Sequence, residues 1–424
     1  AVDHDPQLRT RAFQFVDCLP SLQSHDDIAG HLTEYFTPDR VQLPPAAFAL
    51  LGDGPLRRMR TEWIGRLTRW GAKQMAGRFI TGYDTASVIR TLERLRGQGM
   101  AFTLDVLGES TTSYHQADRY AATYHQLIDE LSPKTAGWSN VPILDETLDG
   151  SMPRLNLSLK LTGLDPHCDA IDPDRAIREI GQRLRPILRK ARAAGALVNI
   201  DMESTKHRAL TLEVFMRLMV EDEFRDWSDV GIVVQAYLKG GERDLNDLLE
   251  WGKRRGCRFV IRLVKGAYWD SETAAAVRNY KEPPVWTKKW QSDANYERMA
   301  RVMLQNLRVI RPAFASHNVR SLAVVLATAE ELNLSPREYE VQMLYGMGDP
   351  LKTAMVRLGQ CVRIYCPYGA LMQGMAYLIR RLLENTSNEG FLKQSGQDRG
   401  SHEQLLADPA IARPPSASLP VRIY

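Results

Sequence analysis

The sequence predicts an α/β protein, a (β/α)8 TIM-like barrel that follows an N-terminal helical arm. Eight short apolar runs recur between residues 101 and 369 of the 424-residue chain, and each run is followed by room for a helix. No Gly-x-Gly-x-x-Gly pattern follows any of these runs. A doubly wound dinucleotide-binding sheet needs that pattern, so we favour the barrel over this alternative.

Residues 1–97 are predicted to form the helical arm. Ser24 is a candidate N-cap, and Gly97 is a candidate C-cap where the last helix of the arm closes. The sequence between Pro55 and Phe79 contains seven Lys or Arg residues and one acidic residue. Two interpretations stay open for this basic segment, an ordinary solvated helix face or a helix that binds a membrane surface or phosphate.

The barrel itself is predicted over residues 98–390. Its eight strands are expected to start at Phe102, Leu155, Leu197, Gly231, Phe259, Phe314, Tyr339 and Cys361. Beyond residue 390 the chain is rich in Ser, Gly, Asn and Pro. We therefore expect residues 391–424 to be a linker or tail.

The composition is that of a folded globular protein. Hydrophobic residues make up 44% and charged residues 25%, and the net charge of +4 does not by itself call for nucleic acid. Five scattered cysteines without a Cys-x-x-Cys pair argue against a disulfide framework or a structural zinc site, and favour a cytoplasmic location. No apolar run approaches membrane-spanning length, and a chain that begins at Ala1 suggests a processed or excised segment.

Polar residues lie inside or just beyond the apolar runs, where the active sites of such barrels form. They are Asp105, Glu109, Lys160, Asp201, Glu203, Gln235, Arg262, Lys265, Tyr268, His317, Asn318, Gln342, Tyr345 and Tyr365. So many polar groups exceed what packing needs, because an unpaired buried polar group costs several kcal/mol. For any one of them, strand-end capping or an internal salt bridge remains an alternative.

A helix-period segment near the end of the barrel is the sharpest local feature. Tyr377, Arg380, Arg381 and Glu384 fall at i, i+3, i+4 and i+7 on one polar stripe. Two adjacent arginines can bind a small carboxylate through several charge-assisted hydrogen bonds. The alternative is a solvated basic face.

Motifs for other chemistries are missing from the sequence. The nine histidines show no His-Glu-x-x-His or His-x-His spacing, and no serine lies in Gly-x-Ser-x-Gly. We therefore expect no metal site and no nucleophilic serine, and an organic cofactor becomes the expected source of reactivity.

Five strings together resemble the proline dehydrogenase domain of the proline utilization A (PutA) family. They are RLVKGAYWDSE (262–272), ASHN (315–318), YEVQMLYGMG (339–348), RIYCPYG (363–369) and YLIRRLLENTSN (377–388). The resemblance runs from about residue 104 to about residue 391, in family order. It implies a distorted (β/α)8 barrel with non-covalent FAD, which agrees with the strand count.

The resemblance also implies roles for individual residues. Arg262 would lie beside the reactive flavin nitrogen, and the other cofactor-binding residues would be Gln235, Lys265, Gly266, Ala267, Trp269, Thr287, Lys288, His317, Asn318 and Glu384. Lys160, Asp201 and Tyr268 would join Arg262 as catalytic residues. The substrate-binding set would be Lys160, Asp201, Tyr268, Leu344, Tyr365, Tyr377, Arg380 and Arg381, with Asp105 and Glu109 supporting the lysine and the arginines.

The implied reaction is oxidation of L-proline to Δ1-pyrroline-5-carboxylate, with electrons passing from FAD to ubiquinone or another membrane quinone. Peripheral membrane contact during turnover would follow. The aldehyde dehydrogenase domain of such bifunctional proteins is expected to be missing from this chain, and no DNA-binding module is expected. Two alternatives remain, another flavin or folate barrel oxidoreductase, and a non-enzymatic scaffold or nucleic-acid binder built on the basic arm.

Overall fold

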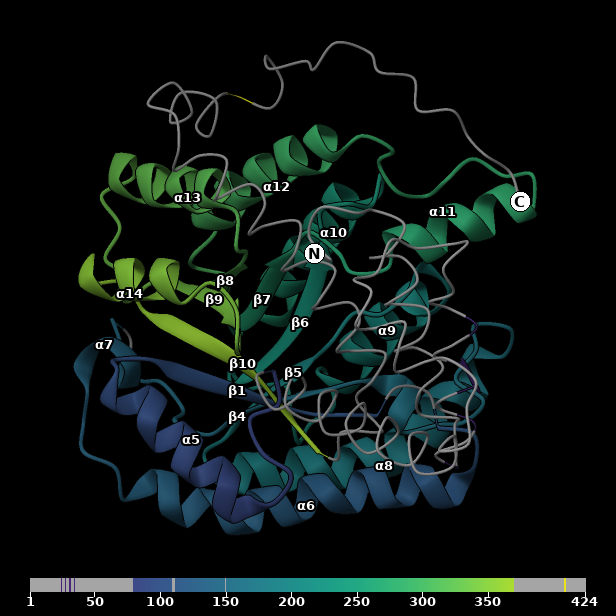
Figure 1. The fold of residues 1–424 in the computed structure, drawn as a ribbon, viewed down its shortest axis with the longest axis horizontal. Coiled ribbons are helices and arrows are strands. Elements are labelled where there is room, and N and C mark those ends of the chain that lie inside the picture. Colours follow the sequence, from purple (N-terminus) through teal and green to yellow (C-terminus); the bar gives the residue numbers. More distant parts are fainter. Residues whose placement is uncertain are drawn as a thin grey trace, which may run out of the picture.

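The computed structural model describes residues 79–108, 111–148 and 150–369, with Ser24, Asp27, Gly30, His31, Glu34 and Asp408. A closed barrel of parallel strands forms its centre, in the order β1-β10-β9-β8-β7-β6-β5-β4 (Figure 1). These strands are β1 (Ala101–Val106), β4 (Asn156–Leu159), β5 (Leu197–Ile200), β6 (Val230–Gln235), β7 (Phe259–Val264), β8 (Ile310–Ala315), β9 (Glu340–Leu344) and β10 (Val362–Tyr368). The predicted eight-stranded α/β barrel is confirmed.

Helices surround this barrel, and each barrel strand from β1 to β9 is followed by at least one of them before the next barrel strand. They are α6 (Tyr114–Ala136), α7 (Pro142–Asp145), α8 (Pro173–Ala193), α9 (Thr205–Leu218), α10 (Gly241–Arg255), α11 (Trp269–Arg278), α12 (Lys289–Leu304), α13 (Val319–Glu331) and α14 (Asp349–Arg357). Helix α5 (Thr85–Gly97) precedes β1 and buries Val88, Leu92 and Leu95 in the same core as the strands. A short hairpin of β2 (Glu146–Thr147) and β3 (Gly150–Ser151) follows α7.

Side chains at the helix starts explain where several helices begin. The Asp84 carboxylate accepts the Ser87 N–H at 2.7 Å, and the Asn318 side chain accepts the Ser321 N–H at 2.9 Å. The end of α5 differs from the prediction that Gly97 caps it. Gln98 is the cap, and Gly99 supplies the left-handed conformation with φ 76°, because the chain turns into β1 only after a further residue.

The start of β8 also differs from the prediction. The strand begins at Ile310, four residues before the expected start at Phe314. Arg311 and Pro312 gave this segment the composition of a loop, since a proline inside a run argues against a central strand. The structure accommodates both residues, and Arg311 pairs with Asp229 at 2.8 Å.

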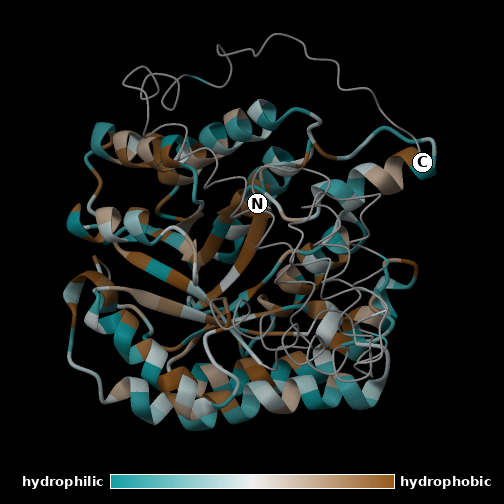
Figure 2. Ribbon diagram, in the orientation of Figure 1, coloured by the Kyte–Doolittle hydropathy of each residue, from teal (hydrophilic) through white to brown (hydrophobic). Residues whose placement is uncertain are grey.

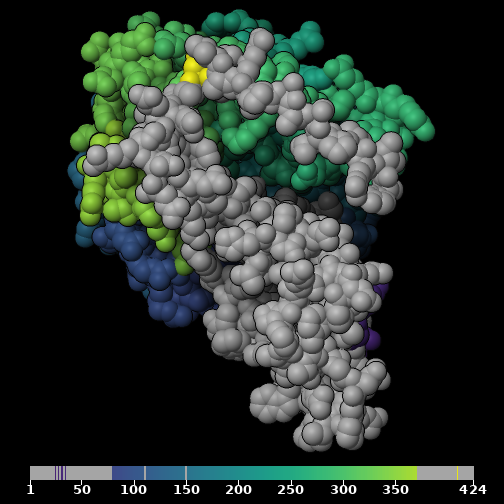
Figure 3. All heavy atoms as spheres, turned by 45° about the horizontal axis from the view of Figure 1, so that its top comes forward, coloured from purple at the N-terminus to yellow at the C-terminus, as the bar shows by residue number. Residues whose placement is uncertain are grey.

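Residues before α5 are tied to the carboxyl end of β10. The Thr81 N–H donates to the Pro367 carbonyl at 2.8 Å, and Gly82 bridges to Tyr368. Figure 3 shows the blue surface of the α5 region against the yellow-green surface of the last described strand and helix. The segment just before α5 therefore lies beside the carboxyl end of β10, the last described strand.

The apolar core lies between the strands and the helices, where Figure 2 shows the brown residues. The inside of the barrel is different, because Thr103, Ser158, Asn199 and Gln342 are all buried there. Thr103 and Ser158 place their hydroxyl oxygens 3.4 Å apart across the β1–β4 seam. This polar interior leads toward the carboxyl ends of the strands.

Candidate active site

Five strands bring predicted site residues into direct contact toward their carboxyl ends. Asp105 is the next-to-last residue of β1, Lys160 follows β4, and Asp201 follows β5. The Lys160 ammonium donates to both Asp105 oxygens at 2.7 Å and lies 3.8 Å from Asp201 Oδ2. These side chains are buried, so the contacts form a buried charged cluster.

Asp201 is shared between two further predicted residues. Its Oδ1 accepts from Arg262 Nη1 at 2.7 Å, and its Oδ2 accepts from the Tyr365 hydroxyl at 2.7 Å. The Arg262 guanidinium also lies over the Tyr365 ring, 5.5 Å from its centroid. The structure therefore joins Asp105, Lys160, Asp201, Arg262 and Tyr365 into one cluster, which we call the carboxyl-end cluster.

Burial sets the protonation of this cluster. It raises the pKa of Asp105 to about 6, although the Lys160 ammonium opposes that shift. For Lys160, burial disfavours the charge, but Asp105 and Asp201 outweigh it and raise its pKa well above the usual value. Burial and the same carboxylates raise the pKa of Tyr365. At neutral pH the lysine is charged and the phenol keeps its proton.

Some polar atoms beside the cluster are buried with no partner among the described residues. They are Nε and Nη2 of Arg262 and Oε1 of Gln235, whose Nε2 donates to the Glu203 carbonyl at 3.0 Å. Leaving such groups without a hydrogen bond costs about 1–3 kcal/mol each. Guanidinium donors and an amide oxygen suit the polar edge of a flavin ring, so these residues fit the cofactor that the sequence resemblance implies.

A glycine beside these atoms keeps the chain close to its neighbour. Gly266 has φ 130°, and a Cβ there would meet the Tyr237 ring at 2.3 Å. Lys265 next to it pairs with Asp293, and burial lowers the Lys265 pKa despite that carboxylate. The segment after β7 is thus a tightly fitted turn that carries one partly buried cation.

Other predicted cofactor residues already have structural partners. His317 Nε2 accepts the Leu344 N–H at 2.9 Å, which ties the ends of β8 and β9 together. Asn318 caps α13 through its side-chain oxygen. Trp269 donates its indole N–H to the Trp286 carbonyl at 2.8 Å. Thr287 and Lys288 are exposed just before α12.

Gln342 and Tyr345, within and just after β9, both contact other parts of the described chain. Gln342 is buried and donates to Glu340 of the same strand. Tyr345 accepts a hydrogen bond from Arg94 of α5 at 2.7 Å. Glu203 is buried and accepts from the Thr162 hydroxyl at 2.7 Å, so it braces the loop after β4.

Five predicted residues lie outside the described residues, namely Glu109, Tyr377, Arg380, Arg381 and Glu384. Two tyrosines of α6 were not predicted although they contact the site backbone. Tyr120 accepts the Lys160 N–H at 3.2 Å, and Tyr124 donates to the Ser158 carbonyl at 2.6 Å. Their i, i+4 spacing on an apolar helix face was the available signal.

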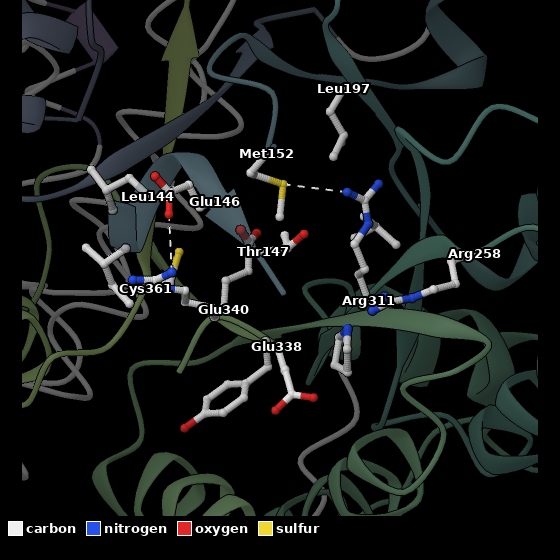
Figure 4. Close-up of a pocket in the computed structure, with 15 residues that line it drawn as sticks. Leu144, Glu146, Thr147, Met152, Leu197, Arg258, Arg311, Glu338, Glu340 and Cys361 are labelled. Atoms are coloured by element: carbon white, nitrogen blue, oxygen red, sulfur yellow. Dashed lines mark hydrogen bonds and ion pairs between the residues drawn. The ribbon is translucent and has the colours of Figure 1, made fainter. Parts of the chain in front are cut away.

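A second charged region lies at the amino ends of the strands (Figure 4). Arg363 is fully buried and donates through Nε to both Glu340 oxygens, at 3.0 and 2.9 Å, and through Nη1 to the Phe102 carbonyl at 2.7 Å. The Met152 side chain beyond the β2–β3 hairpin faces this end, beside Arg311. The remaining hollow has room for about one water molecule.

The part of the chain that the structure describes has neither a candidate metal site nor a candidate membrane-spanning helix. Across these parts of the chain, no three His, Cys, Asp or Glu side chains group to hold a metal ion. Among the helices described, none is long and apolar enough to cross a bilayer.

Known proteins resemble this chain along most of its length. It is 33% identical over 345 residues to the bifunctional protein PutA of Escherichia coli K12, which covers 80% of this chain and 25% of that protein. It is 30% identical to proline dehydrogenase 2 of Bacillus subtilis, covering 78% of this chain and 94% of that enzyme. The chain thus spans about a quarter of the bifunctional relative.

Solved structures agree with the sequence comparison. The crystal structure of proline utilization A from Bdellovibrio bacteriovorus, inactivated by N-propargylglycine, matches all of this chain and 42% of its own, with a TM-score of 0.88 and 39% identity. The proline utilization A N-terminal domain model matches residues 2–79. The proline dehydrogenase model matches residues 88–394, and the chain therefore belongs to the proline dehydrogenase family.

Proposed function

We propose that this chain oxidises L-proline to Δ1-pyrroline-5-carboxylate with FAD held at the carboxyl end of the barrel. The observation that carries the proposal is that two nitrogens of buried Arg262 and the side-chain oxygen of buried Gln235, on paired strands, have no partner among the described residues. They border a cluster in which lysine, carboxylates and a tyrosine already contact one another. Such an edge suits a flavin on one side and a small polar substrate on the other.

FAD would supply the chemistry of hydride acceptance from the ring carbon beside the proline nitrogen. Arg262 and Gln235 would bind the polar edge of its ring, and Lys265 would contribute a cation beside it. The remaining proposed cofactor residues are Gly266, Ala267, Trp269, Thr287, Lys288, His317, Asn318 and Glu384. A fixed guanidinium at that edge stabilises negative charge without reorganising during the reaction.

Charge balance explains what the carboxyl-end cluster would do for the substrate. Asp105 and Asp201 offset Lys160 and Arg262, so the cluster carries two charges of each sign. Because both carboxylates already have cationic partners, neither is left to stabilise a proline ammonium, and the cluster favours the neutral proline amine, whose lone pair is needed for oxidation. Arg380 and Arg381 are proposed to bind the carboxylate, and Tyr365, Tyr377, Leu344 and Tyr268 to enclose the ring.

The electron acceptor is proposed to be ubiquinone or another membrane quinone, with peripheral membrane contact during turnover. This part of the proposal draws its support from the family resemblance. The proposal covers the first oxidation of proline alone, because the chain spans about a quarter of its bifunctional relatives.

Steady-state turnover with L-proline and a water-soluble quinone tests the proposal. We expect the pyrroline product to accumulate and to react with 2-aminobenzaldehyde to give a coloured adduct. Pipecolate and other cyclic imino acids serve as competitors for the substrate assignment. Absence of product from FAD-loaded protein, or faster turnover of another imino acid, contradicts the proposal.

A further inference from the structure

The barrel closes between β1 and β4 through a short ladder. These strands pair only at Leu104 with Leu157 and at Asp105 with Ser158, whereas β1 pairs with β10 along all of Ala101–Val106. The ladder therefore ends at the pair Asp105–Ser158, two residues before Lys160. Something other than the ladder must fix the separation of the two strands there.

Two phenol groups of α6 occupy this place. The Tyr124 hydroxyl accepts the Val106 N–H of β1 at 3.4 Å and donates to the Ser158 carbonyl of β4 at 2.6 Å. The Tyr120 hydroxyl lies 3.1 Å from it and accepts the Lys160 N–H at 3.2 Å. One hydroxyl is thus interposed between the strands, and the other holds the backbone of the site lysine.

Both tyrosines are held firmly against the barrel wall. Tyr124 is 0% exposed and Tyr120 is 7% exposed, and burial raises the pKa of both phenols. Gly163 in the turn after Lys160 lies flat against Tyr120, since a Cβ there would come within 2.4 Å of its ring. The phenols therefore have no room to follow the strands if the strands move.

We propose that Tyr120 and Tyr124 are positioning residues that hold Lys160 against Asp105. The tyrosine hydroxyls set the spacing of β1 and β4 from outside the barrel. Inside the barrel, the Lys160 ammonium meets the Asp105 carboxylate at 2.7 Å. Removing either hydroxyl leaves buried backbone groups without partners and lets the seam shift. A shift approaching 1 Å at a reacting geometry lowers rates by about 100-fold.

The test uses Tyr124→Phe and Tyr120→Phe with Tyr339→Phe as matched control. Tyr339 is also buried, donates to Gln360 at 2.8 Å and lies at the amino end of β9, away from the carboxyl-end cluster. All three variants lose one phenol hydroxyl and should lose similar thermal stability. Only the first two should disturb Lys160.

The first readout is acetylation of Lys160 by acetic anhydride, measured by peptide mass spectrometry relative to exposed Lys289. A lysine released from Asp105 has a lower pKa, so we expect at least threefold more labelling in Tyr124→Phe and Tyr120→Phe and no change in Tyr339→Phe. Tyr120→Phe removes only one backbone contact, so it decides the matter if Tyr124→Phe does not fold.

The second readout is kcat/KM for L-proline, and this part rests on the proposed function. We expect about a tenfold loss in both seam variants and wild-type values in the control. Labelling or kinetics equal to the control in both seam variants overturns the positioning role. If wild-type protein does not oxidise proline, the proposed function fails, whereas the labelling readout still decides the role of the tyrosines.

Discussion

Each end of the barrel buries an arginine against an acidic residue, but the two arginines differ in how many of their N–H groups have no partner among the described residues. At the carboxyl end, Arg262 uses Nη1 on Asp201, and its Nε and Nη2 have no partner in the described chain. At the amino end, Arg363 uses Nε on Glu340 and Nη1 on the Phe102 carbonyl, which leaves Nη2. The amino end is also filled by Met152 and neighbouring side chains (Figure 4).

The two ends together show that a buried charge alone does not identify a functional site. The amino-end pair connects β9, β10 and the β1 backbone, which is the work of a structural ion pair. The carboxyl-end cluster combines unused donors with a lysine and a tyrosine that share acids. Function is expected where donors remain available to a ligand.

The largest effect is expected from Arg262→Met, which removes the unused donors. In protein that retains FAD, the flavin reduction potential should fall and reduction by proline should slow by about 100- to 1000-fold, because a preorganised charge is lost. Anaerobic stopped-flow and dye-equilibration potentials measure both. Unchanged potential and unchanged rate would return Arg262 to a structural role.

Arg363→Met is expected to lower stability and to leave substrate binding unchanged, the opposite of Arg262→Met. It leaves Glu340 buried without its partner, so the free energy of unfolding should fall by about 3–5 kcal/mol, measured by urea denaturation. The KM for proline of the folded protein should stay at its wild-type value. Arg363→Met combined with Glu340→Gln should recover part of the stability, and a large rise in KM would contradict the assignment.

Lowering the pH is expected to change activity and stability in opposite directions through Asp105. Its pKa is raised from 3.8 to about 6, so the carboxylate is neutralised as pH falls through 6 and Lys160 loses its charged partner. We expect kcat/KM to fall below pH 6. Because the folded pKa lies above the unfolded one, the contribution of Asp105 to stability is full below about pH 4 and is lost as pH rises to 6.

Asp105→Asn is the matched variant for this pH prediction. It should remove the acid limb near pH 6 from the pH profile of kcat/KM and flatten the stability change between pH 4 and 6. An unchanged acid limb in this variant would assign that ionisation to another group.

The smallest effect is expected in substrate preference at Tyr365. Its ring should pack where a 4-hydroxyl would project, so proline should be favoured over 4-hydroxyproline. Tyr365→Ser should reduce that preference by about tenfold. Tyr365→Phe keeps the ring and loses only the hydrogen bond to Asp201, so the preference should remain. Ratios of kcat/KM for the two substrates measure this, and an unaltered ratio in Tyr365→Ser contradicts the role.

The strand pattern predicted the barrel and its carboxyl-end residues because parallel strands bring their ends together. Asp105, Lys160, Asp201, Arg262 and Tyr365 were all found this way. The start of β8 was not predicted, because Arg311 and Pro312 give that segment a composition typical of a loop. Sequence position did not reveal that Gln342 donates to Glu340 of its own strand.

Other features could not be predicted because they depend on which elements meet in space. Tyr120 and Tyr124 read as ordinary core positions of a helix until the β1–β4 seam is placed beside them. The contact of Arg363 with Glu340 depends on strand register. Neither spacing nor composition distinguishes an inward-facing pair at the amino end from one at the carboxyl end.

The visible spectrum of FAD-loaded protein, recorded anaerobically before and after L-proline, tests most directly whether the carboxyl-end cluster is the active site. The account predicts a yellow flavin spectrum that proline bleaches in wild type and, at a similar rate, in Arg363→Met. Arg262→Met with bound FAD should bleach at least 100-fold more slowly. A flavin that proline does not bleach in wild type, or that bleaches equally slowly in both arginine variants, would contradict the account.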